Sequence, residues 1–180
     1  QWTTIPLALH GVVVLKNGKK VEIKVGEDPA DPVFYIDDLL PHLGAEQMAK
    51  GGAKIIEGEQ LNVVVGSMPY DDEKVEKKIK LTVLNILNEK YGMCEEDFIS
   101  AELSAVPAYP ARDIGFDRAL IGAYGHDDRV CAYPALTAVL NNESEHTVVA
   151  MLVDKEEIGS EGNTGMQSRI YSDLLEDICE

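Results

Sequence analysis

The sequence predicts an α/β protein in two blocks, a β-rich block over residues 1–69 and an α/β block over residues 70–180. The first block is predicted by short apolar runs that alternate with turn residues. The second is predicted by apolar runs of strand type that alternate with segments of helical spacing, an order typical of α/β layers. We place the boundary at Ser67-Met68-Pro69, because this segment reads as the close of the β-rich block.

Four strands are expected in the first block. The apolar runs 11–15 and 21–25 flank Asn17-Gly18. Asn-Gly between apolar runs is the strongest short-range signal for a hairpin, since both residues tolerate positive φ. Two further strands are expected at residues 33–36 and 61–65, with glycines as breakers between them.

The second block opens with Asp71-Asp72, which suit the N-terminus of a helix that we expect to run to about Tyr91. Apolar residues recur there at helical spacing, and Gly92 supplies a stop. Four more elements are expected in the chain order strand 98–106, helix 130–140, strand 146–153 and helix 164–178. This order predicts a largely parallel or mixed sheet, whose strand ends are where ligands usually bind.

Composition excludes several classes of function. The chain has 180 residues and a formal net charge of −16, so we expect no nucleic-acid partner, because phosphate binding needs a basic face. No apolar run approaches the roughly 20 residues of a membrane span, and we expect no membrane association. The three cysteines match no metal-ligand spacing and favour reduced thiols in a cytoplasmic protein. Ordered patterns at both ends lead us to expect an internal piece of a longer protein.

Two pairs of adjacent acids are the strongest functional signal. Glu156-Glu157 follows the apolar run 147–153, and Asp127-Asp128 opens the apolar helical segment 130–140. Crowded carboxylates repel one another and desolvate badly, and a divalent metal is the commonest compensation. In a dinuclear zinc hydrolase one carboxylate bridges two metals about 3.5–4 Å apart, another binds one metal, and an unligated one takes a proton from water. The two pairs therefore predict a carboxylate-bridged metal site.

The residue types suit this division of roles. Asp127 has a short side chain at a helix start, which suits the bridge. Neighbouring side chains that leave a strand end point in different directions, so one of Glu156 and Glu157 can face the metal while the other faces the water. Simpler interpretations stay open, with Asp127-Asp128 as a helix cap and Glu156-Glu157 as a solvated loop.

At these residues the sequence resembles a known family. The segments that carry the resemblance are Ile114–Arg118, Gly125–Tyr133 and Asp154–Met166, together with Trp2–His10 in the first block. They are similar to the aspartyl aminopeptidase family of dinuclear zinc exopeptidases, which is related to yeast vacuolar aminopeptidase I. The resemblance implies part of a zinc-exopeptidase α/β/α sandwich, with an inserted β-rich dimerisation domain over residues 1–69.

The resemblance also implies an activity and roles for particular residues. The activity is removal of an N-terminal residue, typically acidic, from peptides by a large homo-oligomer that uses a metal-activated water and two zinc ions. Carried over, Asp127 is the bridging ligand, Glu157 a terminal ligand and Glu156 the general base. His10 matches a position that reaches toward the active site of a neighbouring subunit, although a satisfied core or interface histidine is the simpler interpretation.

This chain departs from the family pattern at the remaining ligands. The family takes one histidine from before its inserted domain, and an aspartate and a second histidine from after the Glu-Glu motif. None of the four histidines of this sequence occupies those positions, so we expect weak or no activity from residues 1–180 alone. Two alternatives stay open: a non-catalytic oligomerisation or regulatory module, and a related dinuclear metallohydrolase such as a deacylase.

Overall fold

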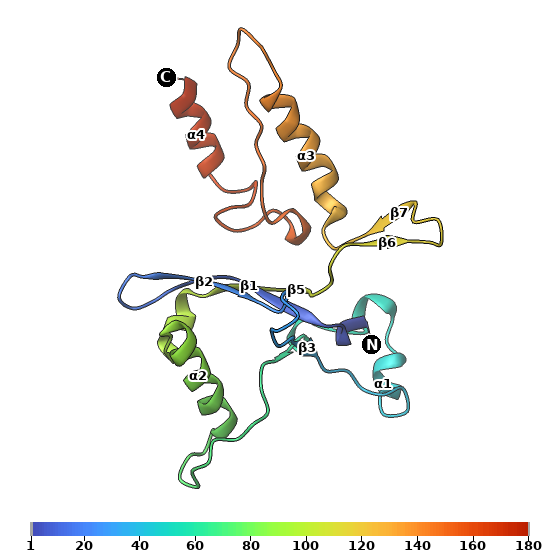
Figure 1. Ribbon diagram of the computed structural model, residues 1–180, viewed down its shortest axis with the longest axis vertical. Coiled ribbons are helices and arrows are strands. Elements are labelled where there is room, and N and C mark those ends of the chain that lie inside the picture. Colours follow the sequence, from blue (N-terminus) through green and yellow to red (C-terminus); the bar gives the residue numbers. More distant parts are fainter. Residues whose placement is uncertain (1, 180) are drawn as a thin grey trace. The chain divides into compact units, whose positions relative to one another are not determined.

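The computed structural model describes residues 2–179, which form two compact units divided between Tyr124 and Gly125. Helices and strands are mixed along the chain, as expected (Figure 1). The predicted domain boundary after residue 69 concerns the inserted domain of the family and stays a prediction. None of the helices within residues 2–179 is long and apolar enough to cross a membrane.

The first unit is built on a three-stranded antiparallel sheet with the order β2-β1-β5 (Figure 1). Its strands are β1 (Leu7–Val14), β2 (Lys20–Val25) and β5 (Glu102–Pro107). β1 is the central strand and passes close to β5 at Gly11, where a Cβ would collide with the backbone carbonyl of Glu102. A larger residue at position 11 would therefore push the two strands apart.

The predicted hairpin at Asn17-Gly18 is confirmed. The N–H of Leu15 donates to the carbonyl of Lys19 at 2.8 Å, and the N–H of Gly18 donates to the carbonyl of Leu15 at 2.7 Å. Gly18 adopts φ 84°, a conformation that glycine reaches without steric cost. The turn fixes the register of β1 and β2, because the loop length decides which residues face each other.

One face of the sheet carries the core. Buried Val13, Ile23 and Val25 point to this face and pack with Leu15 and Met93. Helix α2 (Lys78–Tyr91) contributes Leu87 and Tyr91 to the same cluster. Residues directly opposite across the strands share a face, so the other face carries a different set of side chains. That set includes His10, Val12 and Val14 of β1, with Lys24 of β2 and Ser104 of β5.

Helix α2 ends where the sequence predicts and begins later. Gly92 adopts φ 71° and donates its N–H to the carbonyl of Asn88 at 2.8 Å, which is the expected glycine stop. The predicted start at Asp71-Asp72 is wrong, because the carboxylate of Asp72 accepts the N–H of Lys74 at 2.9 Å and closes a local turn. The helix then starts at Lys78.

Short elements complete the first unit. The predicted strands at residues 33–36 and 61–65 appear as a two-stranded antiparallel sheet of β3 (Tyr35–Ile36) and β4 (Val63–Val64). The predicted strand 98–106 is shortened to β5, because 3-10 helix η4 (Glu95–Ser100) occupies its first residues. The remaining elements are η1 (Trp2–Thr4), α1 (Ala45–Met48), η2 (Gly52–Lys54), η3 (Gly58–Gln60), β6 (Arg112–Ile114) and β7 (Leu120–Gly122).

The second unit contains α3 (His126–Leu140), 3-10 turn η5 (Glu156–Ile158) and α4 (Ile170–Cys179). Two predictions are wrong here. Residues 146–153 form no strand, although Asp154 makes an isolated parallel bridge to Gly165. An apolar run becomes a strand only where neighbouring strands pair with its backbone. The sheets described within residues 2–179 are all antiparallel, so the predicted parallel or mixed sheet is not present.

Candidate functional site

Asp127 and Asp128 lie in an irregular start of α3. The cap residue Gly125 adopts φ 80°, and Asp127 and Asp128 depart from helical backbone angles, with ψ 113° at Asp127. The peptide bond between the two aspartates is cis. Both side chains are exposed. The Asp128 carboxylate hydrogen bonds with the Cys131 thiol, which raises the pKa of that thiol. The two acids therefore project from a non-helical segment that leads into a regular helix.

Glu156 and Glu157 share a single 3-10 turn. Left-handed residues enclose it, with Lys155 at φ 67° and Gly159 at φ 91°. The N–H groups of Gly159 and Ser160 close the turn on the carbonyls of Glu156 and Lys155, at 2.9 and 2.8 Å. Both glutamate side chains are exposed. Because a 3-10 helix has three residues per turn, adjacent side chains point about 120° apart.

A second segment holds this turn from outside. The side-chain amide of Gln167 donates to the carbonyl of Gly159 at 2.6 Å, and its backbone N–H donates to the carbonyl of Ser160 at 3.2 Å. Asp154 bridges to Gly165 just ahead of the turn. The backbone that presents Glu156 and Glu157 is therefore fixed on both sides, while their carboxylates face solvent.

The structure does not gather the candidate ligands into a complete site. Within residues 2–179, no group of three or more His, Cys, Asp or Glu side chains lies close enough to hold a metal ion. Asp127 and Asp128 occupy one segment of the second unit, and Glu156 and Glu157 occupy another. The roles of Asp127 and Glu157 as ligands and of Glu156 as base stay predictions.

His10 belongs to the first unit and lies on the face of the sheet away from the core. It stands opposite Lys24 in β2 and Ser104 in β5. Its Nε2 lies 3.2 Å from Oε1 of Glu27, and Nζ of Lys24 lies 3.0 Å from Oε2 of the same carboxylate. The Lys24 ammonium, and then His10, hold the pKa of Glu27 below its ordinary value. The role of His10 at a neighbouring subunit stays a prediction.

Sequence reasoning missed Glu27. The hairpin register could have identified Glu27, because the turn at Asn17-Gly18 places His10 opposite Lys24. Glu27 follows Lys24 by three residues, just after β2 ends at Val25. In that register the Glu27 carboxylate lies within reach of both the His10 ring and the Lys24 ammonium. The same register places His10 on the face of the sheet away from the core.

Comparison with known proteins identifies the family. The model of the aminopeptidase I zinc metalloprotease (M18) family matches residues 1–180. The chain belongs to this family. The M18 match agrees with the resemblance seen in the segments around both acid pairs and around His10. It also extends that resemblance over all of residues 1–180.

Several relatives in the M18 family are about half identical to this chain. A protein of Clostridium acetobutylicum named probable M18 family aminopeptidase 1 is 51% identical over 179 residues, which cover 99% of this chain and 38% of the relative. A protein of the same name from Thermotoga neapolitana is 50% identical over 182 residues, covering 99% of this chain and 39% of the relative. The chain therefore spans about two fifths of the length of these relatives.

Solved M18 structures share the fold. A crystal structure of an M18 aminopeptidase from Thermotoga maritima superposes with a TM-score of 0.82 at 48% identity, covering 98% of this chain and 39% of that chain. Aminopeptidase I from Clostridium acetobutylicum gives a TM-score of 0.83 at 51% identity, covering 99% and 40%. The mixed arrangement of helices and strands described above is therefore that of M18 aminopeptidases.

The M18 family is described as a family of zinc metalloproteases, so the acidic side chains of this chain can be compared with the ligands of catalytic zinc sites. Catalytic zinc sites usually take three protein ligands from Cys, His, Asp and Glu and keep one open position. Asp127 and Glu157 supply carboxylates, a ligand type that can bridge the two metals of a dinuclear site or bind one of them as a terminal ligand. Residues 2–179 gather no three-ligand group, so the acids of this chain fit part of a zinc site and not all of it.

Proposed function

We propose that the protein containing this chain is a zinc-dependent aminopeptidase that removes the N-terminal residue, preferably an acidic one, from peptides. The family match over residues 1–180 and relatives near 50% identity support the activity. The preference for an acidic N-terminal residue is supported by the family resemblance alone. Because the chain spans about two fifths of these relatives, the proposal places the activity in the longer protein, with further zinc ligands supplied by other segments.

In this proposal the second unit supplies three carboxylates with different tasks. Asp127, at the irregular start of α3, would be the bridging zinc ligand, and Glu157, in η5, would be a terminal ligand. When bound, the zinc pair polarises the peptide carbonyl and makes water a better nucleophile. Asp127 suits the bridge because its side chain is short and it lies just ahead of the regular part of α3.

Glu156 is the proposed general base. Its carboxylate oxygen accepts a proton from the attacking water and holds it for the departing amine, which needs a proton to leave. The observation that carries this assignment is the 3-10 turn η5, which holds Glu156 and Glu157 on adjacent positions. Side chains about 120° apart let one carboxylate face a metal while the other faces the water.

The test is Glu156→Gln in the full-length protein with zinc supplied. We expect kcat to fall by about 10²- to 10⁴-fold, because the amide cannot accept the proton, while the Tm and the zinc content stay unchanged. Glu161→Gln, an exposed acid just beyond the turn, is the matched control and should keep its activity. Unchanged turnover in Glu156→Gln would remove the base assignment.

A panel of substrates tests the reaction class. Peptides with N-terminal Asp, Glu or Leu compare acidic with neutral residues, and an N-acetylated peptide tests for a deacylase. The proposal expects hydrolysis of free N-termini, fastest for Asp or Glu, and none of the acetylated peptide. Hydrolysis of only the acetylated substrate would favour the deacylase alternative.

Self-association through the β-rich block is part of the same proposal. The face of the sheet away from the core exposes Val12 by 42% and Val14 by 37%, which supports a contact with another subunit. A cytoplasmic location is also proposed, because the three cysteines are free thiols and reducing compartments keep thiols free. Sedimentation of the full-length protein tests the first statement, and cell fractionation tests the second.

A further inference from the structure

Gln167 lies in the second unit, in the segment between η5 and α4. Its side-chain amide donates to the carbonyl of Gly159 at 2.6 Å, and its backbone N–H donates to the carbonyl of Ser160 at 3.2 Å. One residue therefore makes two hydrogen bonds to the two residues that directly follow η5. Two bonds fix the orientation of the turn relative to this segment, whereas a single bond would leave it free to rotate.

The contact from Gln167 continues to the backbone beside Glu156. The peptide group between Gly159 and Ser160 accepts the Gln167 amide through its carbonyl. Through its N–H the same peptide group donates to the carbonyl of Lys155 at 2.8 Å. That carbonyl belongs to the peptide bond that precedes Glu156. A chain of two hydrogen bonds thus runs from the Gln167 side chain to the backbone that carries Glu156.

The backbone around η5 departs from the conformation that such residues prefer by themselves. Lys155 at φ 67° and Ser160 at φ 60° adopt the left-handed region, which residues other than glycine rarely occupy. A single 3-10 turn also contains few hydrogen bonds of its own, and their geometry is poorer than in an α-helix. Contacts from outside the turn are therefore needed to hold one backbone arrangement.

The segment that carries Gln167 is itself held in place. The hydroxyl of Tyr171, in the first turn of α4, donates to the carbonyl of Thr164 at 2.6 Å. Gly165 is buried, and a Cβ at this position would collide with the carbonyl of Ser160. The segment and the turn are therefore in close contact. Gln167 projects from a support that is tied to helix α4.

The proposed chemistry depends on where the Glu156 carboxylate lies. A general base must be within hydrogen-bond reach of the water that it deprotonates. A displacement of about 1 Å at a reacting group can lower a rate by about 10²-fold. Because Glu156 is exposed, its side chain takes its direction mainly from the backbone of the turn. Whatever holds that backbone therefore also directs the carboxylate.

We propose that Gln167 is a positioning residue for the peptidase reaction. It acts through the peptide group between Gly159 and Ser160, and it keeps the Glu156 carboxylate directed toward the attacking water. This role rests on the proposed function, because it requires Glu156 to be the general base. Gln167 itself contacts neither zinc nor substrate in this proposal, so its loss should affect the rate more than the binding of either.

Gln167→Met in the full-length protein with zinc tests this role, because methionine has a similar length and donates no hydrogen bond. We expect kcat to fall by about 10- to 100-fold. KM should change by less than about twofold, and the zinc content and the Tm should stay close to those of the wild type. A lower Tm with unchanged kcat would assign Gln167 to the stability of the fold alone. That result, or unchanged values of both, would overturn the proposal.

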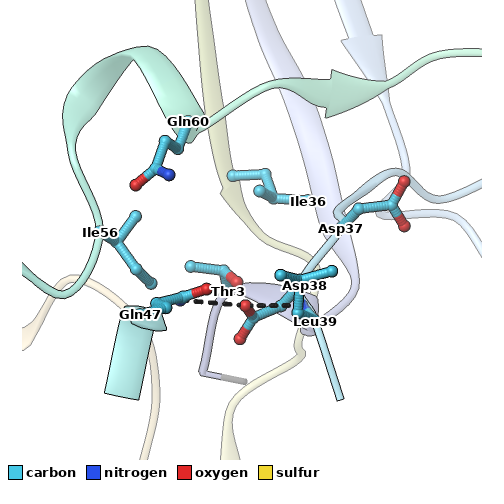
Figure 2. A pocket seen from close by; sticks show the side chains of 8 residues that line it. All are labelled: Thr3, Ile36, Asp37, Asp38, Leu39, Gln47, Ile56 and Gln60. Carbon is cyan, nitrogen blue, oxygen red and sulfur yellow. Dashed lines mark hydrogen bonds between the residues drawn. The ribbon is translucent and has the colours of Figure 1, made fainter. Parts of the chain in front are cut away.

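Two control variants lose a comparable hydrogen bond elsewhere in the chain. Gln47→Met removes an amide that donates to the Asp38 carboxylate at 3.2 Å in the first unit, marked by a dashed line in Figure 2. Ser172→Ala removes a hydroxyl that donates to the carbonyl of Arg169 at 2.9 Å at the start of α4. Both variants should keep kcat within about twofold of the wild type. A fall in either control as large as in Gln167→Met would indicate a general disturbance and contradict a specific role.

A double-mutant cycle shows whether Gln167 acts through Glu156. In Glu156→Gln the base is absent, so adding Gln167→Met should change kcat by less than about twofold. A further loss of about tenfold or more would reveal a path that bypasses Glu156, and the proposal would fall. Failure of the proposed function gives a different result. A wild-type protein that holds zinc and hydrolyses no peptide would remove the peptidase, and this role with it, before any Gln167 variant is compared.

Discussion

The carboxylate of Asp97 accepts the backbone N–H of Lys16 at 2.7 Å, across 81 positions of sequence. The same carboxylate accepts the backbone N–H of Cys94 at 2.8 Å and lies 3.2 Å from its Sγ. Asp97 is 5% exposed, so these partners replace water. One side chain thus ties the turn between β1 and β2 to η4, which leads into β5.

Asp97→Asn is expected to destabilise the first unit. An amide side chain has one acceptor oxygen, so one of the two backbone N–H groups loses its partner. We expect the Tm to fall by roughly 2 to 8 °C, in keeping with the loss of one or two hydrogen bonds in a chain of this size. Thermal unfolding measures this, and Asp71→Asn, an exposed acid of the same unit, is the control. Equal Tm values for the two variants would contradict the structural role.

The hydrogen bonds of the Asp97 carboxylate lead us to expect that the stability of the fold depends on pH. The N–H of Cys94, its thiol and Lys16 hold the pKa of Asp97 below the ordinary value of 3.8. The unfolded chain therefore binds this proton more readily than the folded chain. The contribution of Asp97 to the free energy of unfolding is fully present at pH values above the ordinary pKa of 3.8. It is lost as the pH falls through the lower pKa of the folded state.

Denaturant midpoints of the wild type and Asp97→Asn, measured between pH 7 and pH 2.5, test this dependence. We expect the difference between the two proteins to be constant near neutrality and to shrink below about pH 4, because protonation removes the contribution from the wild type alone. The pKa of Glu27 is also lowered, so the variant keeps part of the acid sensitivity. A difference that persists unchanged to pH 2.5 would rule out a charge effect at Asp97.

Local signals were enough to predict the hairpin and the end of α2. Asn17-Gly18 and Gly92 act through their own backbone conformations, with φ 84° at Gly18 and 71° at Gly92. Such conformations depend little on the rest of the chain. The start of α2 was mispredicted for an equally local reason, because the side chain of Asp72 closes its own turn.

The wrong strand predictions have a common cause, because strands form by pairing with residues far away in the sequence. Residues 146–153 have the composition of a buried strand, yet Val149 is 51% and Leu152 is 52% exposed in this structure. A strand needs partners, and a single sequence does not name them. The pairing of β5 with β1 was equally invisible, because the two strands lie far apart in sequence.

The candidate site was predictable in residue type and not in geometry. Adjacent acids after an apolar run singled out Asp127, Glu156 and Glu157, and these residues lie on irregular turns that expose their carboxylates. Their proposed zinc roles stay predictions, because residues 2–179 gather no group of three metal ligands. The contact between His10 and Glu27 requires a register that only pairing of β1 with β2 supplies.

Asp127→Asn is expected to lower the metal content of the full-length protein. A bridging carboxylate holds two metals at once, and an amide carries no charge and ligates weakly. Elemental analysis should find about two zinc ions per wild-type chain and fewer than about one in the variant. Glu161→Gln should retain the wild-type content. Equal zinc content in Asp127→Asn would show that Asp127 is not a ligand, whatever its effect on activity.

His10 gives the last prediction, because its proposed partner is the active site of another subunit. His10→Ala should lower kcat/KM, and the Tm should change little, since the His10 side chain is 36% exposed. Ser104→Ala, opposite His10 on the same face, is the control. Loss of activity in Ser104→Ala as well would indicate a general disturbance of the sheet.

Mixed oligomers separate a role within a subunit from a role between subunits. His10→Ala and Glu156→Gln are each expected to be poorly active when assembled alone. After unfolding and reassembly together, some sites combine an intact Glu156 from one subunit with an intact His10 from its neighbour. Recovered activity in the mixture, above the sum of the two separate variants, is the expected result. If the mixture gains nothing although subunit exchange is demonstrated, His10 serves its own subunit or only the sheet, where its Nε2 lies 3.2 Å from Oε1 of Glu27.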